Sequence, residues 1–344
     1  MIFIRSVVNK YCVALVVPWC GGQHKIPSIP HAVSSSTRLL ASLSFNPPDP
    51  PASKGIPVYP NIDFAKGNDP CSEATKRNGD SNAVYVVSGA SRGIGVQFVR
   101  SLMERTKGKI VACCRSPESA IGLNEYIVSL PEIDAKRICK VVLDLEKQDT
   151  IESAAATIRD KFHRVDILFN VAGILGDGLT TPGPERSISK LDRSWIEETM
   201  AVNVIGPLML SKELAPLMKS KIRGKVNEGQ AQRPIAIIAS LSARVGSIAD
   251  NELGGWISYR MSKSALNQAT RTMAHELKRQ GTWTVALHPG TTDTDLSKPF
   301  QGNVQEGRLF PVNFTVNRLL DVIDSMQEEH SGGLYDWAGK ALPF

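Results

Sequence analysis

The chain has 344 residues, 42% of them hydrophobic and 22% charged, which is enough for one large or two medium globular domains. Its formal net charge of +6 is not gathered into a basic stripe, so the sequence gives no support to nucleic-acid binding. The six cysteines include no CxxC pair and no histidine cluster at metal spacing, so neither a disulfide framework nor a metal site is predicted.

The N-terminal segment, residues 1–48, contains no Asp or Glu and carries scattered Lys and Arg among Ser, Pro and small residues. This composition is typical of organelle transit peptides. We therefore expect a transit peptide directed to the plastid, with the mitochondrion as the alternative. A secretory signal built on residues 11–20 is a further alternative. The longest apolar run, residues 11–17, is shorter than the roughly 20 residues that span a bilayer, so no integral membrane span is predicted.

The next segment, residues 49–81, is dense in Pro, Gly, Asp and Asn and shows no sustained hydrophobic period. Such composition is typical of a linker. We expect the leader and the linker to be disordered, and we expect a folded domain to survive removal of the residues before about Asn78.

Strand and helix patterns alternate from residue 82 to residue 344. Strands are predicted at residues 83–89, 109–114, 140–145, 166–173, 234–240 and 283–289. Helical periodicity is found at residues 93–105, 116–130, 149–162, 192–220 and 258–279. This alternation predicts a single α/β domain over residues 82–344, with a doubly wound parallel sheet of the Rossmann type.

A glycine-rich turn, VVSGASRGIG, joins the first predicted strand to its helix. Glycines allow a tight turn and close approach of the backbone to a pyrophosphate, whose charge the helix N-terminus stabilises. The spacing GxxxGxG is a variant of the usual dinucleotide fingerprint, and a turn that serves only helix packing is the alternative. The predicted cofactor-binding residues here are Gly89, Ser91, Arg92, Gly93, Ile94 and Gly95.

The second strand ends in Cys-Cys-Arg115, where an NAD-binding protein would carry an acidic residue. Arg115, together with Arg92, favours a cofactor with a 2′-phosphate, so NADP(H) is predicted. Asp144 follows the third strand and could accept a hydrogen bond from the adenine amino group, with Leu145 beside it. The alternative for Asp144 is a helix cap.

Tyr259 and Lys263 are four residues apart, so they lie on one face of a predicted helix. A nearby ammonium favours the phenolate, so the pair could donate and accept a proton near neutral pH. Taken alone, a Tyr and a Lys at this spacing usually form part of an ordinary solvated helix face.

In combination, these motifs carry a resemblance to the short-chain dehydrogenase/reductase family over residues 82–344. The further matching motifs are Asn170-Val-Ala-Gly173, Asn203, Pro289-Gly290 and Thr294, in the family's order. Within the family, GSIADNELGGWISYRMSKSALNQA is most similar to the C-factor and sniffer-type carbonyl reductases.

The resemblance implies a role for each matching residue. Tyr259 would protonate the substrate carbonyl oxygen, Lys263 would hold the nicotinamide ribose, and Asn203 would position a water beside Lys263. The residues implied to line the remaining cofactor cleft are Asn170, Ala172, Gly173, Pro289, Gly290, Thr292 and Thr294. An NADP(H)-dependent reaction on a small-molecule carbonyl or alcohol is implied, and a homodimer is possible.

The family's active-site serine precedes a glycine by three positions, and counting back from Gly246 gives Ala243 instead. We expect Ser242 to take the role if the strand end bulges or turns, because a one-residue shift reverses the side-chain direction. Ser240, or no serine at all, are the alternatives. The rival function is a non-catalytic NADP-binding signalling or scaffold protein, which the alanine at position 243 would suit.

Overall fold

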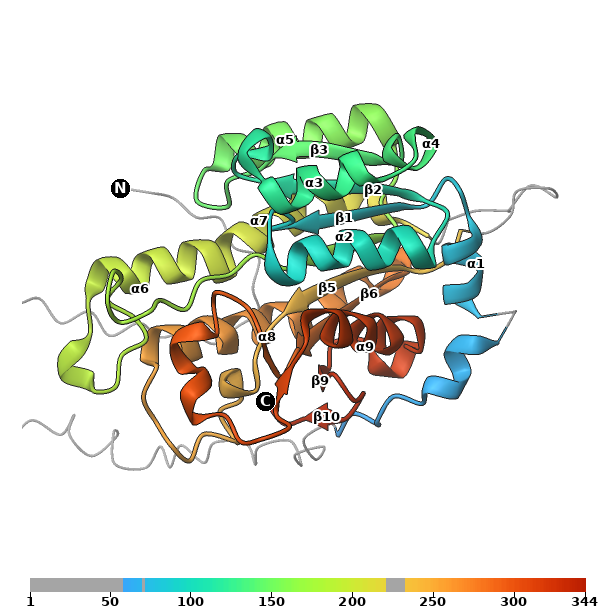
Figure 1. Ribbon diagram of the computed structural model, residues 1–344. Helices are drawn as coiled ribbons and strands as arrows, with labels where there is room; N and C mark the ends of the chain where they lie inside the picture. Colours follow the sequence, from blue (N-terminus) through green and yellow to red (C-terminus); the bar gives the residue numbers. More distant parts are fainter. Residues whose placement is uncertain (1–57, 70–71, 221–232) are drawn as a thin grey trace, which may run out of the picture. The chain divides into compact units, whose positions relative to one another are not determined.

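The computed structural model describes residues 58–69, 72–220 and 233–344, and the predicted transit peptide lies outside these ranges. Its centre is an eight-stranded sheet in the order β10-β9-β6-β5-β4-β1-β2-β3, with helices on both faces (Figure 1). The strands are β1 (Val84–Ser88), β2 (Lys109–Cys114), β3 (Ile138–Val142), β4 (Ile167–Asn170), β5 (Ala236–Leu241), β6 (Thr282–His288), β7 (Thr291–Thr292), β8 (Leu309–Phe310), β9 (Leu334–Asp336) and β10 (Ala341–Leu342). The helices are α1 (Glu73–Gly79), α2 (Gly93–Arg105), α3 (Ile121–Ser129), α4 (Glu132–Ala135), α5 (Gln148–Phe162), α6 (Arg193–Met200), α7 (Gly206–Leu214), α8 (Ile257–Leu277) and α9 (Val312–Asp324).

The strand order reverses at β1, which lies between β2 and β4. The register sets Ser88 at the end of β1 beside both Cys113 and Asn170. Every pairing in the large sheet is parallel except that of β9 with β10. Doubly wound sheets bind ligands outside the carboxyl ends of the strands at such a switch point. The predicted Rossmann-type parallel sheet is confirmed.

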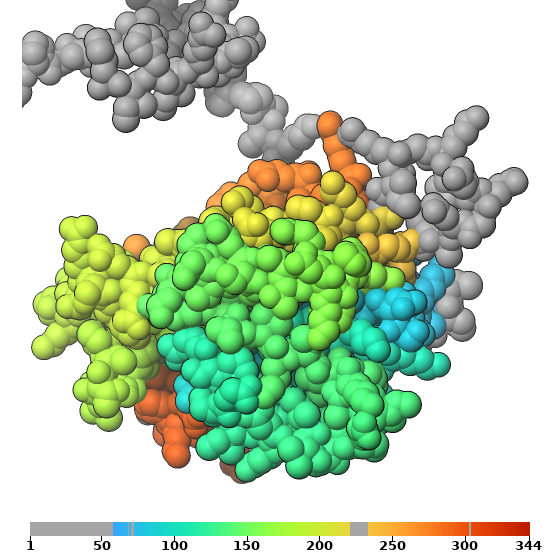
Figure 2. Space-filling view, turned by 90° about the horizontal axis from the view of Figure 1, so that it is seen from above, coloured from blue at the N-terminus to red at the C-terminus, as the bar shows by residue number. Residues whose placement is uncertain are grey.

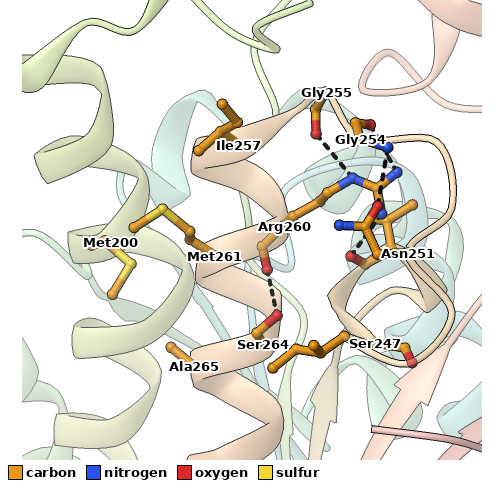
Figure 3. Close-up of a pocket in the computed structure, with 12 residues that line it drawn as sticks. Met200, Ser247, Asn251, Gly254, Gly255, Ile257, Arg260, Met261, Ser264 and Ala265 are labelled. Carbon is orange, nitrogen blue, oxygen red and sulfur yellow. Dashed lines mark hydrogen bonds between the residues drawn. The ribbon is translucent and has the colours of Figure 1, made fainter. Parts of the chain in front are cut away.

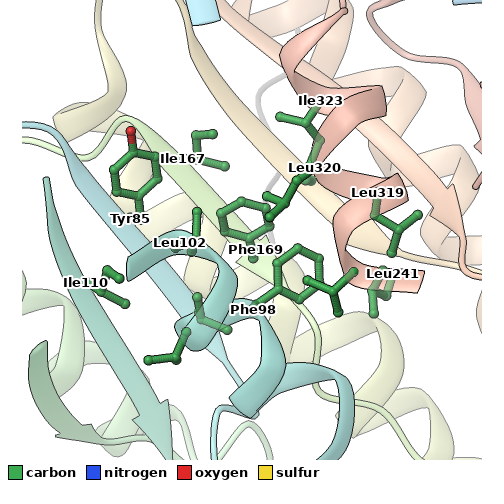
Figure 4. Close-up of a cluster of buried hydrophobic side chains, with 14 of the residues drawn as sticks. Tyr85, Phe98, Leu102, Ile110, Ile167, Phe169, Leu241, Leu319, Leu320 and Ile323 are labelled. Carbon is green, nitrogen blue, oxygen red and sulfur yellow. The ribbon is translucent and has the colours of Figure 1, made fainter. Parts of the chain in front are cut away.

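The strands at the centre of the sheet are buried because helices cover both faces. On one face, α2 and α9 pack over β1 and β4, and the rings of Phe98 and Phe169 lie 4.7 Å apart (Figure 4). On the other face, Ile151 and Ile158 of α5 and Leu210 of α7 contact the same strands. Continuous apolar strands of this kind require two covered faces, as their sequence predicts.

Several element boundaries differ from the predictions. β2 covers the predicted residues. β3 is found at Ile138–Val142 and so begins before the predicted residue 140, because its pairing with β2 begins where Ile138 lies opposite Ile110. The predicted helix 192–220 is interrupted by a π-helical turn at Ala201–Ile205. Helix α9 and the strands after β6 were not predicted.

The predicted linker, residues 49–81, is in part an ordered piece of the domain, so that expectation is wrong for the residues described. Ser72 caps α1 by accepting a hydrogen bond from Thr75 N, and Arg77 of α1 is 1% exposed and paired with Asp324 of α9 at 3.0 Å. Glu73 accepts a hydrogen bond from Ile235 N at 2.7 Å. The partners lie far away in the chain, so local composition could not reveal them.

Candidate active site

The glycine-rich turn after β1 meets the segment after β4. Gly89 has φ of +71°, and a Cβ on it would come within 2.9 Å of the Ala172 backbone. A Cβ on Gly95 would lie 2.0 Å from the carbonyl oxygen of Gly89, so only glycine fits at the start of α2. Gly93 is open apart from Thr294, whose methyl group would be 3.5 Å from an added Cβ. The turn thus leaves backbone N–H groups at the N-terminus of α2 close to any bound phosphate.

Tyr259 and Lys263 lie one turn apart on α8, and the Lys263 ammonium is 5.5 Å from the Tyr259 ring centre. Lys263 is buried and donates a hydrogen bond to Leu241 O at 2.8 Å. Burial raises the pKa of Tyr259 to about 12 and lowers the pKa of Lys263 to about 8. Desolvation of the phenolate is the cause of the Tyr259 shift, so the phenol is protonated at neutral pH, contrary to the expected shift toward the anion.

Asn203 lies in the π-helical turn and ties that turn to the chain after β4. Its side chain accepts from Ile174 N at 2.8 Å and donates to Ile174 O at 2.9 Å. It also donates to Ser262 Oγ of α8 at 3.1 Å. A Cβ on Gly173 would lie 3.2 Å from Asn203 Oδ1 and 3.6 Å from Lys263 Nζ, so these three predicted residues meet.

Ser242 has a different partner from the one predicted. Its side chain is buried, and its hydroxyl donates to Asn267 Oδ1 of α8 at 2.6 Å. Ala243 follows in extended backbone, with φ of −151° and ψ of 150°, so its side chain points to the opposite side from that of Ser242. The pairing of β5 with β6 is regular up to Leu241, and Ser242 N continues it by donating to Leu287 O at 2.8 Å, so the Ser242 hydroxyl is directed at Asn267 in this structure. Ser240 is fully buried and accepts from Asn170 Nδ2 at 3.4 Å.

This geometry predicts different results for the two neighbouring positions. Ser242→Ala should leave kcat within about threefold and lower the free energy of unfolding by about 1 to 2 kcal/mol, because Asn267 Oδ1 loses its donor in a buried place. Ala243→Ser should raise kcat by about tenfold or more, since it adds a hydroxyl at the family's position. Steady-state kinetics and urea unfolding measure both. A Ser242→Ala variant with a hundredfold lower kcat would contradict the assignment.

The predicted determinants of cofactor type follow β1, β2 and β3. The Arg115 side chain is exposed and makes no ion pair or hydrogen bond with the described residues. Arg92 is also exposed and lies 3.6 Å from Asp295. Asp144 accepts from Glu146 N at 3.2 Å and pairs with Lys147 at 3.3 Å, so its side chain shapes the turn before α5. Arg115 is therefore free to meet an anion and Arg92 is held only by an exposed ion pair, whereas Asp144 is occupied locally.

The remaining predicted residues surround the same edge of the sheet. Thr292 is buried and shares a hydrogen bond with Thr315, and Gly290 packs against Phe310. Asn170 is buried and donates to Ser211 Oγ at 3.2 Å, so its side chain points into the protein. Leu145 packs under Gly206. Three further predicted residues make no side-chain hydrogen bond with the described residues: Ser91 in the glycine-rich turn, Ile94 in the first turn of α2 and Pro289 after β6.

A separate pocket of about 480 Å³ lies on the outer face of α8 (Figure 3). Its lining includes Met261, Ser264 and Ala265, with Met200 across from them. With about 3.6 residues per turn, these positions lie on the side of α8 away from Tyr259 and Lys263. This pocket is therefore distinct from the predicted catalytic face.

Three residues around the start of α8, which carries Tyr259, were not predicted from the sequence. The Trp256 ring lies 6.4 Å from the Tyr259 ring and 5.2 Å from the ring of Phe300. Glu185 is 1% exposed and binds Ser258 next to Tyr259. Only the tryptophan stands near a motif in the sequence, so spacing gave no signal for the other two.

No group of three or more His, Cys, Asp or Glu side chains that could hold a metal lies within residues 58–69, 72–220 and 233–344. Across the same ranges, no helix is both long enough and apolar enough to cross a membrane.

The fold and the site define a Rossmann-type α/β protein with a nucleotide-binding turn and a Tyr–Lys pair. The model of the short chain dehydrogenase family matches residues 83–305, and the chain belongs to this family of oxidoreductases. C-signal of Myxococcus xanthus is 33% identical over 180 residues, covering 52% of this chain and 93% of its own. A 1-hydroxy-2-glutathionyl-2-methyl-3-butene dehydrogenase of Rhodococcus sp. is 29% identical over 252 residues, covering 73% of this chain and 94% of its own.

Solved carbonyl reductases share the fold. The NADPH-bound carbonyl reductase from chicken fatty liver has a TM-score of 0.64 at 29% identity, covering 76% of this chain and 99% of its own. Carbonyl reductase Sniffer of D. melanogaster has a TM-score of 0.64 at 27% identity, covering 77% of this chain and 100% of its own. The resemblance stated from the sequence motifs is confirmed.

Proposed function

We propose that the protein is an NADP(H)-dependent oxidoreductase that transfers hydride between NADPH and a carbonyl compound or secondary alcohol. The observation that carries the proposal is the meeting of Lys263, Asn203 and Gly173, one helical turn from Tyr259 and beside the glycine-rich turn. The similarity to solved carbonyl reductases, one of them with NADPH bound, supports it.

The residues present fit this cofactor. The turn at Gly89–Gly95 would hold the pyrophosphate, Arg115 and Arg92 the 2′-phosphate, and Lys263 the nicotinamide ribose. A bound NADPH would supply the hydride from C4 of its nicotinamide. Tyr259 is protonated at neutral pH and would donate its proton to the substrate oxygen as negative charge develops there.

Lys263 and Asn203 support the proton transfer from the phenol. The Lys263 pKa of about 8 keeps the ammonium mostly charged at neutral pH, which lowers the cost of a transient phenolate beside it. Asn203 holds the Ile174 backbone at the floor of the site. No serine hydroxyl is described at the family's position, so this chain would stabilise the reacting oxygen with one donor fewer.

A second candidate is a non-catalytic NADP-binding signalling or scaffold protein, and the alanine at position 243 is the observation that favours it. Retention of Tyr259 argues against it, because a pure binder requires Lys263 but not the phenol. The experiment that separates the two measures NADPH binding and NADPH oxidation with a panel of aldehydes and quinones. Binding without turnover across the panel would favour the second candidate.

The cofactor preference gives a direct prediction for Arg115. Arg115→Asp should shift the kcat/KM ratio of NADPH to NADH by at least about fivefold toward NADH, because a carboxylate repels a 2′-phosphate and accepts from a free 2′-hydroxyl. A fivefold change corresponds to roughly 1 kcal/mol. Lys107→Asp, on the turn before β2 and at its opposite end, is the control and should leave the ratio unchanged. A smaller shift would mean that another residue meets the 2′-phosphate.

We also propose a destination in the cell and an oligomeric state for the protein. The acid-free composition of residues 1–48 supports delivery to the plastid, with the mitochondrion as the alternative. Fusing residues 1–80 to a fluorescent protein would test the destination. A homodimer stays a prediction, which sedimentation of the purified protein would test.

A further inference from the structure

Glu185 is a buried carboxylate with both oxygens aimed at the start of α8. It lies in the segment between β4 and α6, which projects from the body of the molecule in both views (Figures 1 and 2). Its side chain is 1% exposed. One carboxylate oxygen accepts from Ser258 N at 3.2 Å, and the other accepts from Ser258 Oγ.

The backbone of Glu185 holds the residue before α8 as well. Its carbonyl oxygen accepts from Trp256 N at 2.5 Å. Trp256 is the N-cap of α8 and has φ of 54°, a left-handed conformation that is strained for a bulky side chain. This conformation sets the Trp256 ring against Tyr259 at 6.4 Å. Residues 256 and 258 are thus both bound by Glu185, and the phenol follows at position 259.

Tight packing holds the backbone next to Glu185 in place. Gly183 packs so tightly against Trp195 of α6 that a Cβ there would lie 1.9 Å from the indole nitrogen. The Gly183 carbonyl oxygen also accepts from Gly178 N at 2.6 Å. Through its carboxylate, Glu185 therefore fixes the start of α8, which carries Tyr259, relative to this packed segment.

The geometry points to Glu185 as a positioning residue: we propose that it fixes the first turn of α8 so that the Tyr259 phenol reaches the substrate oxygen. The carboxylate satisfies an N–H group that the helix leaves free, and its negative charge suits the positive end of the helix dipole. A misplacement of about 1 Å can cost about 100-fold in rate, so the contact bears on kcat. This inference rests on the proposed oxidoreductase function.

The chain offers a matched control on another helix. Ser72 caps α1, with its hydroxyl accepting from Thr75 N at 3.0 Å. α1 carries no residue of the predicted catalytic set. Loss of either cap should reduce stability, but only the loss at Glu185 should reach the phenol.

The experiment compares Glu185→Ala, Glu185→Gln and Ser72→Ala in the full chain. Glu185→Ala should lower kcat by about tenfold or more at saturating substrate, with the Kd for NADPH within about threefold of wild type. The kcat of Glu185→Gln should lie between those of wild type and Glu185→Ala, because the glutamine amide oxygen can still accept from Ser258 N. Ser72→Ala should keep the wild-type kcat. Adding Ser258→Ala to Glu185→Ala should cost little more, because both changes remove one contact.

A kcat for Glu185→Ala no lower than that for Ser72→Ala would overturn the proposal. If Glu185→Ala fails to fold, a Glu185→Gln variant with wild-type kcat and no change in exchange at Ser258 would overturn it. Amide hydrogen exchange over residues 254–262 supplies a readout independent of turnover. If wild type reduces no carbonyl, the proposed function fails, and unchanged exchange in Glu185→Ala would separately remove the positioning role.

Discussion

Tyr259→Phe should lower kcat by about 1,000-fold while the Kd for NADPH stays within about threefold of wild type. The substitution removes one oxygen and its proton and keeps the ring that packs against Trp256. General acid catalysis contributes about 100-fold to 10,000-fold to such reactions, and the neighbouring Lys263 ammonium donates to Leu241 O at 2.8 Å. Single-turnover oxidation of NADPH and fluorescence titration of the cofactor measure the two quantities.

Tyr126→Phe is the control for loss of a phenol elsewhere. Tyr126 lies on α3 with its ring beside Arg100, and it belongs to none of the predicted cofactor or catalytic residues. We expect wild-type kcat from this variant. Equal activity in Tyr259→Phe and wild type would be incompatible with the proposed reaction, whereas loss of NADPH binding in Tyr259→Phe would show that the ring position had changed.

The pH dependence should follow from the same two groups. The pKa of Tyr259, raised to about 12, keeps the proton donor intact through neutral pH. Lys263 loses its charge as the pH rises through about 8, and the transient phenolate then loses its neighbouring cation. The kcat for carbonyl reduction should therefore fall as the pH rises above about 8.

Motifs in which the backbone conformation requires a particular residue type could be predicted from the sequence. Gly89 and Gly95 stand where a side chain would collide, so the glycine pattern reports local geometry directly. The Tyr259–Lys263 spacing likewise reports a helix face. Ser242 could not be predicted, because its direction depends on the strand end and on Asn267, which is 25 residues further along the chain.

Most of the structural features that could not be predicted from the sequence depend on contacts between residues far apart in the chain. Glu185 meets Ser258 across 73 residues, and Arg77 meets Asp324 across 247. Composition around each of them is rich in Pro, Gly or polar residues, which ordinarily indicates a loop. Tertiary contacts order these segments, and such contacts leave no periodic hydrophobic pattern in the local sequence.

The contacts of α1 predict a large loss of stability on truncation. A chain beginning at residue 58 keeps every contact described for the domain and is the control. A chain beginning at residue 81 loses Arg77, whose buried guanidinium pairs with Asp324, and Glu73, which accepts from Ile235 N at 2.7 Å. Asn78, which bonds both Asp324 at 3.1 Å and the Tyr85 hydroxyl at 3.1 Å, is lost as well.

The shorter chain should be less stable than the control by about 3 kcal/mol or more, because breaking a buried ion pair alone costs about 3 to 5 kcal/mol when the remaining charge has no other partner. Asp324 keeps Arg105 at 3.3 Å, which moderates that loss, but Ile235 N and the Tyr85 hydroxyl are left without their side-chain partners. The thermal midpoint should fall by roughly 6 to 12 °C. Urea unfolding of the two chains measures the difference directly, and Arg77→Met in the longer chain should reproduce part of it. Equal midpoints for the chains beginning at residues 58 and 81 would instead restore the linker interpretation, since α1 would then contribute nothing to the domain.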